Sequence, residues 1–320
     1  MDKKLLIIGS LNMDMVTEME KMPLIGETIL GDELKYIPGG KGANQAYAAG
    51  SLGKHVSMLG CVGNDEFGKG LIRSLEEKKV DVSLLKKSDT NTGTAIIYVD
   101  NDGNNSIVVI PGANMECDVQ YLKQREKMIQ ECDYLLLQME IPYESVCYAV
   151  ETAYKFHKTI ILNPAPAPDY IGDEILSKLD YITPNETELM KLANGSESDM
   201  DSMKKYACEL LKKGVKNVIV TMGDQGCLLV NEKNQILYPA RKVEAVDTTA
   251  AGDCFNGALT VGLAEGKSIE QAILFANAAS SLAVTKKGAQ SSIPSREEVD
   301  YILQALLCRE EKYEKNTCNY

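Results

Sequence analysis

Residues 247 to 253, DTTAAGD, combine a run of small residues with a single carboxylate at the start of an expected helix. Free N–H groups and the dipole make a helix N-terminus attractive to anions, and Ala250, Ala251 and Gly252 add almost no bulk there. Beside a bound anion, the Asp253 carboxylate can accept the proton of an attacking hydroxyl. The stretch therefore indicates phosphoryl transfer to an alcohol, and a simple helix cap is the alternative interpretation of Asp253.

A glycine-rich segment, GGKGAN at 39 to 44, leads into a second helix of small residues. Its glycines, Gly40 among them, allow a polyol to come close to the backbone. Lys41 and Asn44 offer donors and an acceptor to hydroxyl groups. The segment therefore fits a sugar site, although an ordinary glycine turn with Lys41 in solvent explains it equally well.

Three further polar side chains follow apolar runs. Asn12 and Asp14 come after LLII and share one face if the chain stays extended, which suits two vicinal hydroxyls. A turn that uses Asn and Asp is the alternative. Glu140 follows YLLLQM, at the sheet edge where α/β proteins bind ligands, or else it caps the next helix.

Two segments suit a nucleotide and its metal ion. In DYITPNETE, Asn185 and Glu188 lie three residues apart on an opening helix, so an amide and a carboxylate can hold hydrated magnesium and its phosphates. A capping arrangement is the competing interpretation. In VIVTMGDQG, the residues Thr221, Gly223 and Gly226 follow a strand, where either a nucleotide or a tight turn accounts for them.

Two glycine-rich segments, one of them the GGKGAN segment, resemble nucleotide-binding motifs but lack a residue that each motif requires. GNDEFGKG at 63 to 70 nearly matches a P-loop, but Gly70 stands where Ser or Thr must bind magnesium. GGKGANQA lacks the third glycine of a dinucleotide fingerprint, because Gln45 occupies that position. A P-loop NTPase is therefore rejected, and a nicotinamide oxidoreductase loses its main support.

The amino-acid composition excludes further classes of function. The chain has 320 residues, of which 44% are hydrophobic and 25% charged, and its net charge of -12 argues against nucleic-acid or anionic-membrane binding. Nine scattered cysteines without a C-x-x-C pair, and an opening apolar run of only LLII, predict a cytoplasmic protein without a disulfide framework. His55 and His157 lack the partners of a zinc site or a Ser-His-Asp triad.

The elements that must position these residues alternate along the chain. Short apolar runs predict strands at 5–8, 56–59, 134–139, 159–163, 181–183, 217–222 and 227–230. Amphipathic segments predict helices at 65–79, 120–131, 143–157 and 201–213. This alternation predicts an α/β protein with a mostly parallel sheet, helices on both faces and ligands at the carboxyl ends of the strands.

Two segments, at about 13–38 and 92–110, break this pattern. The second reads as a hairpin around Asp102 and Gly103, and together they could form a small antiparallel sheet beside the main domain. Because a small sheet buries little alone, we expect it to cover the site or to pair with a second subunit. The expected organisation is one domain over 1–308 and a polar, frayed tail over 309–320.

Taken in order, the motifs GSLNMD, GGKGAN, QMEIP, NPAPAP, TPNETE, TMGDQG, DTTAAGD and TKKGAQSS resemble the PfkB carbohydrate-kinase family, within it the branch that phosphorylates ribose. The resemblance covers about residues 4 to 305. It implies a doubly wound, mostly parallel sheet flanked by helices, with a small β-sheet lid. The lids of two subunits would join them as a homodimer.

This resemblance also implies a reaction. The γ-phosphoryl group of ATP would pass to the 5-hydroxyl of D-ribose, giving D-ribose 5-phosphate and ADP. Asp253 would be the base, and Ala250, Ala251 and Gly252 the anion hole. Phosphoryl transfer depends on positioning, charge neutralisation and one carboxylate, which suits a chain with two histidines.

The same resemblance implies ligand contacts residue by residue. The sugar contacts are Asn12, Asp14, Gly40, Lys41, Asn44, Glu140 and Asp253. The nucleotide contacts are Asn185, Thr221, Gly223, Gly226, Gly252 and Asn277. Glu188 matches the acidic residue that organises Mg²⁺. A monovalent cation, usually K⁺, is implied at Asp247, Thr249, Lys286, Gly288 and Ser292.

Three alternatives remain open at this point. A 2-deoxyribose or nucleoside kinase would share the core, although Asn12 and Asp14 favour a sugar with more hydroxyls. A sugar-sensing binding protein would have no use for Asp253 and Glu188. A nicotinamide oxidoreductase is the third alternative, and calorimetry with NAD would exclude it.

Overall fold

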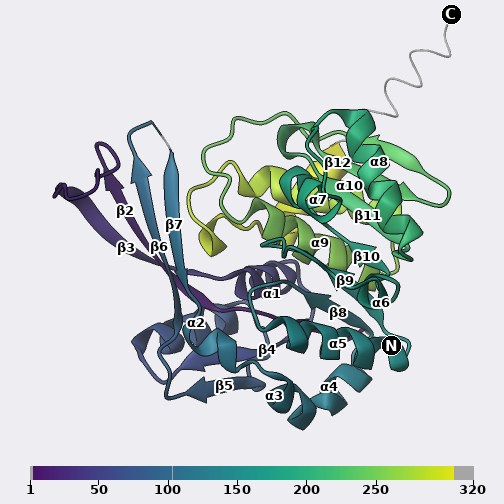
Figure 1. Ribbon diagram of the computed structural model, residues 1–320, viewed down its shortest axis with the longest axis horizontal. Helices are drawn as coiled ribbons and strands as arrows, with labels where there is room; N and C mark the ends of the chain where they lie inside the picture. Colours follow the sequence, from purple (N-terminus) through teal and green to yellow (C-terminus); the bar gives the residue numbers. More distant parts are fainter. Residues whose placement is uncertain (1–2, 103, 306–320) are drawn as a thin grey trace, which may run out of the picture.

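A nine-stranded sheet forms the centre of the molecule (Figure 1). The computed structural model describes residues 3–102 and 104–305, so the tail predicted at 309–320 lies outside the described residues. The strand order is β13-β12-β11-β10-β9-β8-β1-β4-β5. The strands are β1 (Leu5–Ile8), β4 (Val56–Gly63), β5 (Leu85–Ser88), β8 (Tyr134–Leu137), β9 (Thr159–Leu162), β10 (Tyr181–Ile182), β11 (Asn217–Thr221), β12 (Cys227–Asn231) and β13 (Gln235–Tyr238).

Neighbouring strands from β5 to β11 pair in parallel, and the two antiparallel pairings of this sheet are those of β12 with β11 and with β13. The predicted mostly parallel sheet is therefore confirmed. Its side chains alternate between two apolar cores: Leu5 and Ile7 of β1 enter one, while Leu6 and Ile8 enter the other. Because both faces of the parallel strands are covered, these strands read as continuous apolar runs in the sequence.

Helices cover both faces of this sheet. One face carries α1 (Lys41–Ser51), α2 (Glu66–Glu77), α9 (Ala251–Ala264) and α10 (Ile269–Ala283). The other face carries α3 (Val119–Gln124), α4 (Glu126–Glu131), α5 (Tyr143–Lys155), α6 (Asp173–Leu176), α7 (Glu186–Leu192) and α8 (Met200–Lys212). The helix predicted at 120–131 is in fact two helices, because the chain breaks at Arg125, whose N–H bonds to the Leu122 carbonyl at 2.9 Å.

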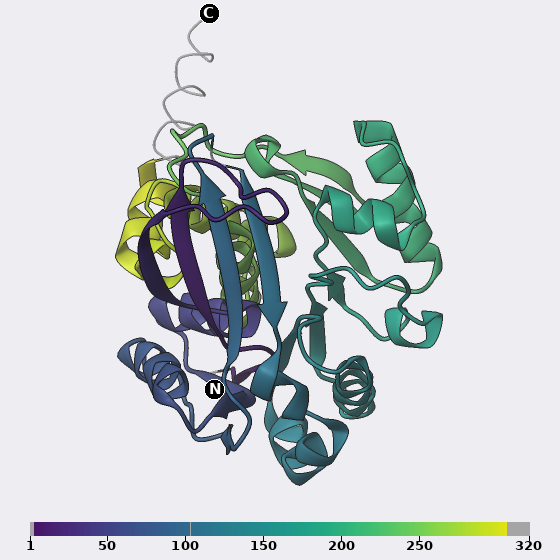
Figure 2. The ribbon, with the colours of Figure 1, turned by 60° about the vertical axis from the view of Figure 1, so that its left-hand side comes forward.

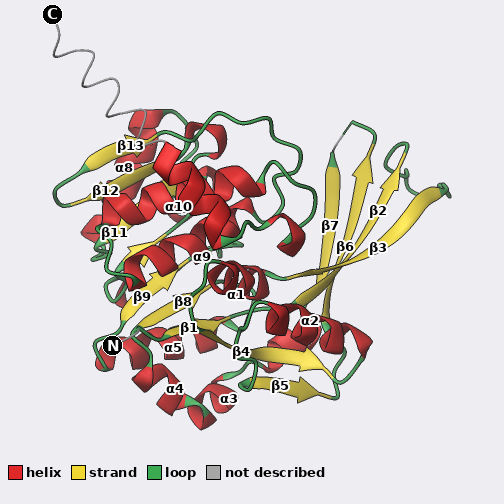
Figure 3. Cartoon of the chain, turned by 180° about the vertical axis from the view of Figure 1, so that it is seen from behind, coloured by secondary structure: helices red, strands yellow, loops and turns green. Residues whose placement is uncertain are grey.

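Helices α1 and α9 lie against each other (Figure 3). Gly257 of α9 makes this close approach necessary: a Cβ there would stand 2.7 Å from the Ala48 Cβ and 2.8 Å from the Gln45 carbonyl oxygen. The two helices that begin with GGKGAN and with DTTAAGD are therefore held at a short, fixed separation.

A second, four-stranded sheet projects from the α/β body (Figures 1 and 3). Its order is β3-β2-β6-β7, and Figure 2 shows its broad face. The strands are β2 (Asn12–Met19), β3 (Gly31–Gly39), β6 (Gly93–Asp100) and β7 (Asn105–Ile110). The β6–β7 pairing confirms the predicted hairpin, although Gly103 itself lies outside the described residues.

The prediction of a purely antiparallel small sheet is wrong in one respect, since β2 and β6 pair in parallel. Both strands leave the α/β body in the same direction, with Asn12 opposite Gly93. The sheet also presents apolar side chains to solvent, and Ile107 and Val108 of β7 are 53% and 54% exposed. Neighbouring side chains of a strand point to opposite faces, so β7 exposes apolar side chains on both, as an interaction surface typically does.

The part of the chain that the structure describes also holds three 3₁₀ turns, η1 (Gly112–Glu116), η2 (Gly223–Gln225) and η3 (Gln290–Ser292). A last helix covers the described residues 296–305. Among the described residues, no helix combines the length and apolar character needed to span a bilayer.

Candidate active site

Asp253 is the third residue of α9 and is only 8% exposed. Its Oδ2 accepts a hydrogen bond from the Asn44 side-chain amide at 3.0 Å, and its Oδ1 accepts one from the Gln45 amide at 3.0 Å. The alternative interpretation of Asp253 as a simple helix cap is therefore wrong, because both carboxylate oxygens are held by side chains of α1. The residue before the helix, Ala250, adopts a left-handed conformation with φ of 58°.

The turn before Asp253 presents backbone N–H groups, as the sequence indicates. The N–H groups of Ala250 and Gly252 make no backbone hydrogen bond within the described part of the chain, whereas that of Ala251 donates to the Thr248 carbonyl at 3.2 Å. Two of the three predicted anion-hole N–H groups are therefore free of a competing acceptor, and the third has a weak one.

The predicted sugar-binding residues converge on Asp253 from three elements. Asn12 and Asp14 lie on β2, Lys41 and Asn44 on α1, and Glu140 follows β8. Burial is the main cause that raises the pKa of Asp14 to about 7, and the charges of Glu140 and Asp253 add to it. The structure therefore brings several carboxylates into one small volume at the carboxyl ends of the central strands.

Lys41 is the cation of this cluster, and it is half-buried rather than free in solvent. Burial works to lower the pKa of Lys41, but the carboxylates of Asp253, Glu140, Glu188 and Asp14 together raise it. A lysine so surrounded keeps its charge and is well placed to neutralise negative charge on a ligand.

Glu140 does not cap the following helix. Its Oε2 accepts hydrogen bonds from the Ser10 hydroxyl at 2.5 Å and from the Lys41 backbone N–H at 3.2 Å. The carboxylate thereby joins the end of β1 to the start of α1, where Gly40 is the N-cap. Ser10 is not among the predicted site residues, and only its place two residues after β1 could have indicated it.

Asn114 of η1 is a second site residue that the sequence did not reveal. It is 1% exposed, and its Nδ2 donates to the Asn12 Oδ1 at 2.7 Å while its Oδ1 accepts from the Leu11 N–H at 2.9 Å. One lone pair of the Asn12 oxygen is therefore occupied, while the Asn12 amide N–H groups make no hydrogen bond among the described residues and can donate to a ligand. Asn44 Oδ1, by contrast, is buried without any partner among the described residues and is available to a hydroxyl donor.

A cavity of about 520 Å³ lies beside the DTTAAGD turn. Gly252 and Ala251 of α9 line it. It also brings together most of the predicted nucleotide contacts, namely Thr221, Gly223, Gly226 and Asn277. Phe255, Arg241 and Lys242 add an apolar wall and two positive charges that the sequence did not single out. The volume and this mixed lining are typical of a small-molecule site.

Asn185 and Glu188 are not among the residues that line this cavity. They form a capping box at the start of α7, with the Asn185 Oδ1 accepting from the Glu188 N–H at 2.8 Å and the Glu188 Oε2 from the Asn185 N–H at 2.9 Å. The capping arrangement, which is the alternative interpretation of Asn185 and Glu188, is therefore present. Burial raises the pKa of Glu188, against the Asn185 N–H and the Lys41 charge, which lower it.

The five residues predicted to hold a monovalent cation lie in two loops that Asp247 joins. Its carboxylate accepts from the Thr249 N–H at 2.9 Å and from the Gly288 N–H at 2.8 Å. Burial works to raise the pKa of Asp247, but these hydrogen bonds lower it overall. The Lys286 ammonium pairs with Glu298 at 2.7 Å, and the buried Ser292 hydroxyl donates to the Ala289 carbonyl at 2.8 Å.

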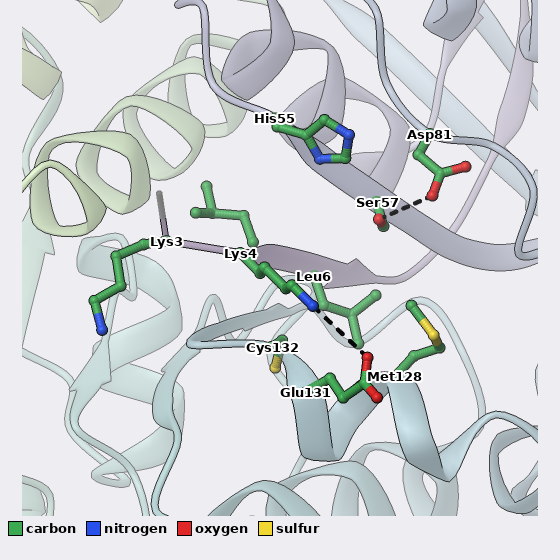
Figure 4. A pocket seen from close by; sticks show the side chains of 10 residues that line it. Lys3, Lys4, Leu6, His55, Ser57, Asp81, Met128, Glu131 and Cys132 are labelled. Atoms are coloured by element: carbon green, nitrogen blue, oxygen red, sulfur yellow. Dashed lines mark hydrogen bonds and ion pairs between the residues drawn. The ribbon is translucent and has the colours of Figure 1, made fainter. Parts of the chain in front are cut away.

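Another cavity, of about 370 Å³, opens at the amino ends of the central strands, the edge opposite Asp253 (Figure 4). His55 lines it together with Asp81, which accepts from the Ser57 hydroxyl at 3.1 Å. The Lys4 ammonium and Glu131 form an ion pair across it at 3.7 Å. His55 is thus remote from the residues predicted to do chemistry.

Comparison with known proteins shows which protein family the chain belongs to. The model of the family described as "pfkB family carbohydrate kinase" matches residues 2–296. The chain belongs to this family. The match confirms the resemblance that the sequence motifs indicate, and it makes the chain a carbohydrate kinase. The DTTAAGD turn and the residues that line the 520 Å³ cavity all lie within this matched range.

Individual pfkB relatives are similar over nearly the whole chain. A ribokinase of Haemophilus influenzae is 40% identical over 93% of this chain and 97% of its own length. A deoxyribokinase of Salmonella typhi is 37% identical over 93% of this chain and 97% of its own length. The structure of Arabidopsis thaliana ribokinase complexed with ribose and ATP matches with a TM-score of 0.87 and 33% identity, covering 95% of this chain and 99% of that one.

Proposed function

We propose that this chain transfers the γ-phosphoryl group of ATP to the 5-hydroxyl of D-ribose, giving D-ribose 5-phosphate and ADP. Ribokinases at about 40% identity support this proposal, as does the similar Arabidopsis thaliana enzyme solved with ribose and ATP. The fold of this chain matches that structure over 95% of its length.

One observation carries the proposal. The Asp253 carboxylate is bonded on one side to Asn44 of the polar cluster, while the residues just before it, Ala251 and Gly252, line the 520 Å³ cavity. A sugar held by the cluster and a nucleotide held in the cavity would meet at this carboxylate. Phosphoryl transfer needs this positioning of acceptor and donor more than it needs any other chemistry.

Each group then has a defined role. Asp253 accepts the proton of the 5-hydroxyl as the oxygen attacks the γ-phosphorus. The N–H groups of Ala250 and Gly252, at the positive end of the α9 dipole, stabilise the charge on the transferring group. Asn12, Asp14 and Asn44 orient the sugar hydroxyls, with Asn12 acting as a donor and the two others offering acceptors.

The ATP base and ribose would occupy the cavity between Thr221, Gly226 and Asn277, with the phosphates directed to Gly252. Arg241 and Lys242 of its lining supply positive charge that favours the nucleotide. Glu188 would hold Mg²⁺ through water at the phosphate side, since one of its oxygens is already committed to the cap. The magnesium ion would neutralise charge on the phosphates.

A monovalent cation, in our proposal K⁺, fits the two loops that Asp247 joins. The ligands would be the Asp247 carboxylate, which already joins the Thr249 and Gly288 loops, and backbone carbonyl groups of those loops, since a hard cation prefers oxygen ligands. Among the described residues no group of three or more His, Cys, Asp and Glu side chains forms a metal site, so carbonyl oxygens would carry most of the coordination. The cation would order the DTTAAGD turn.

The four-stranded sheet would act as a lid that excludes water once sugar binds. The apolar strand β7, with Ile107 to Ile110 all about half exposed, would be covered by the same sheet of a second copy. We therefore propose a homodimer joined through the lids, which removes this exposed surface from water.

A deoxyribokinase is the second candidate, because the Salmonella typhi enzyme of that name is nearly as similar. A nucleoside kinase would require room for a base beside the sugar. Assaying D-ribose, 2-deoxy-D-ribose and nucleosides side by side decides between them. A higher kcat/KM for 2-deoxy-D-ribose would refute our first choice.

The central experiment is a coupled ADP-release assay with these acceptors, with and without K⁺, on the wild type and on Asp253→Asn. We expect ribose-dependent ADP release by the wild type and a fall of about 10²- to 10⁴-fold in kcat for the variant, since it loses the base. Ribose binding measured by calorimetry should stay within about threefold, because Asn is nearly isosteric. Unchanged turnover would remove Asp253 from the mechanism.

A further inference from the structure

A line of buried polar side chains runs behind the proposed catalytic residues. It starts at Gln45 of α1 and takes one residue from the end of each of three neighbouring strands. Gln138 directly follows β8, Asn163 follows β9 and Thr183 follows β10. Asn256 of α9 completes it. All five are at most 6% exposed.

The hydrogen bonds of this line begin at the Asp253 carboxylate. The Gln45 Nε2 donates to the Asp253 Oδ1 at 3.0 Å and to the Asn163 Oδ1 at 3.1 Å. Gln138 holds the other end of the Gln45 amide, since its Nε2 donates to the Gln45 Oε1 at 2.6 Å. The Gln45 side chain is therefore fixed at both its nitrogen and its oxygen.

From Asn163 the line returns to the anion-binding turn. The Asn163 Nδ2 donates to the Thr183 carbonyl at 3.0 Å, and the Thr183 hydroxyl donates to the Asn256 Oδ1 at 2.6 Å. The Asn256 Nδ2 then donates to the Gly252 carbonyl at 2.8 Å. The same set of side chains thus contacts the residue proposed as base and the residue immediately before it.

The direction of the bonds at Gln45 and Gln138 follows from the bond between Gln45 and Asp253. An ionised carboxylate can only accept, so the Gln45 amide must turn its NH₂ group toward Asp253 and its oxygen toward Gln138. Gln138 must then turn its own NH₂ toward Gln45, and its Oε1 remains buried without a partner. A core built only for stability would avoid such an unpaired acceptor.

We propose that Gln45 is a positioning residue, which holds the Asp253 carboxylate in the orientation that accepts the proton of the acceptor hydroxyl. Asn44, by comparison, touches the other carboxylate oxygen and faces the sugar. Gln138 and Asn163 keep the Gln45 amide in its one productive orientation, and Asn256 fixes the Gly252 peptide relative to the same frame. This inference rests on the proposed function, because it needs Asp253 to act as the base.

The test is Gln45→Met, which keeps the length of the side chain and removes its hydrogen bonds. We expect kcat to fall about 10- to 100-fold, as for a reacting group that is slightly misplaced, while the Kd for ribose stays within about threefold. Gln130→Met is the matched control, because Gln130 lies on α4, across the sheet, and bonds only to Glu126 among the contacts described. It should leave kcat unchanged.

A second measurement separates positioning from general loosening of the core. In the Asp253→Asn background, Gln45→Met should change the residual kcat less than about twofold, since Gln45 acts through that carboxylate. An equal fall in both backgrounds, or an unchanged kcat in the single variant, would overturn the proposal. If Gln45→Met does not fold, Gln138→Met carries the test with an expected fall of about 3- to 10-fold, again with sugar affinity kept, and full activity there would overturn it.

The wild type assayed with the same sugars keeps the two proposals apart. A wild type that releases no ADP with any sugar would refute the proposed function. A wild type active on ribose, together with a fully active Gln45→Met variant, would refute the role of Gln45 alone.

Discussion

The pH dependence of sugar binding follows from the environment of Asp14. Burial, with smaller contributions from Glu140 and Asp253, raises the pKa of Asp14 to about 7. At that pKa the carboxyl group is about one-tenth ionised at pH 6 and about nine-tenths ionised at pH 8. If sugar hydroxyls donate to the ionised form, ribose should bind about tenfold more tightly at pH 8 than at pH 6, which corresponds to about 1.4 kcal/mol.

Calorimetry measures both the affinity and the protons exchanged. At pH 7 we expect about half a proton to be released per ribose bound, seen as a heat that depends on the ionisation enthalpy of the buffer. Asp14→Asn should weaken binding and remove the proton release. Asp201→Asn, a change of the same kind at an exposed position of α8, should alter neither. A wild-type Kd that is constant within twofold between pH 6 and 8 would refute the reasoning.

The same raised pKa predicts an effect on the stability of the sugar-free protein. The folded state binds the Asp14 proton more tightly than the unfolded state, so the stabilisation is complete below about pH 4 and is lost as the pH rises to about 7. The full shift corresponds to about 4 kcal/mol, and partial exposure of Asp14 reduces this to about 1–2 kcal/mol. At pH 8, Asp14→Asn should therefore raise the Tm of the sugar-free protein by a few degrees, as calorimetric melting can show.

Two other substitutions test the sugar site and the cation site. Gly39→Ala would place a Cβ 2.2 Å from the Asp14 Oδ2 and displace that carboxylate, so ribose affinity should fall about tenfold with the KM for ATP unchanged; equal ribose affinity in calorimetry would contradict this. Asp247→Ala removes the acceptor that joins the Thr249 and Gly288 loops, so kcat in KCl should fall to the potassium-free value of the wild type. Undiminished activation in a KCl titration would argue against a cation at this position.

The central sheet could be predicted from the sequence because its strands are buried on both faces and read as continuous apolar runs, such as LLII of β1. The edge strands β5 and β13 were missed: Gln235 to Tyr238 is largely exposed and carries no such run. The parallel pairing of β2 with β6 could not be predicted either. It depends on where two distant segments leave the body, and the local hairpin signal at β6 and β7 says nothing about β2.

The sequence indicates which site residues lie together when they are close along the chain, but not when they are far apart. Asn12 and Asp14 share a face because β2 is extended, and the two-residue spacing indicates this directly. The bond from Gln45 to Asp253 joins residues 208 positions apart, and that from Asn114 to Asn12 spans 102. The pattern of apolar residues does not indicate which side chains meet across such distances in the sequence. From the sequence alone, Gln45 therefore stands out only because it replaces the third glycine of a dinucleotide motif.

Gly257 has a consequence for the range of acceptors that this scaffold can serve. It sets the gap between α1, which carries Lys41 and Asn44, and α9, which carries Asp253, and any side chain at this position would act as a spacer between them. The separation of α1 and α9 is therefore fixed. It cannot increase to fit a bulkier sugar without moving the sugar hydroxyl away from the Asp253 carboxylate. New acceptor shapes would have to be accommodated by the four-stranded sheet, which projects from the body and lies outside this helix pair.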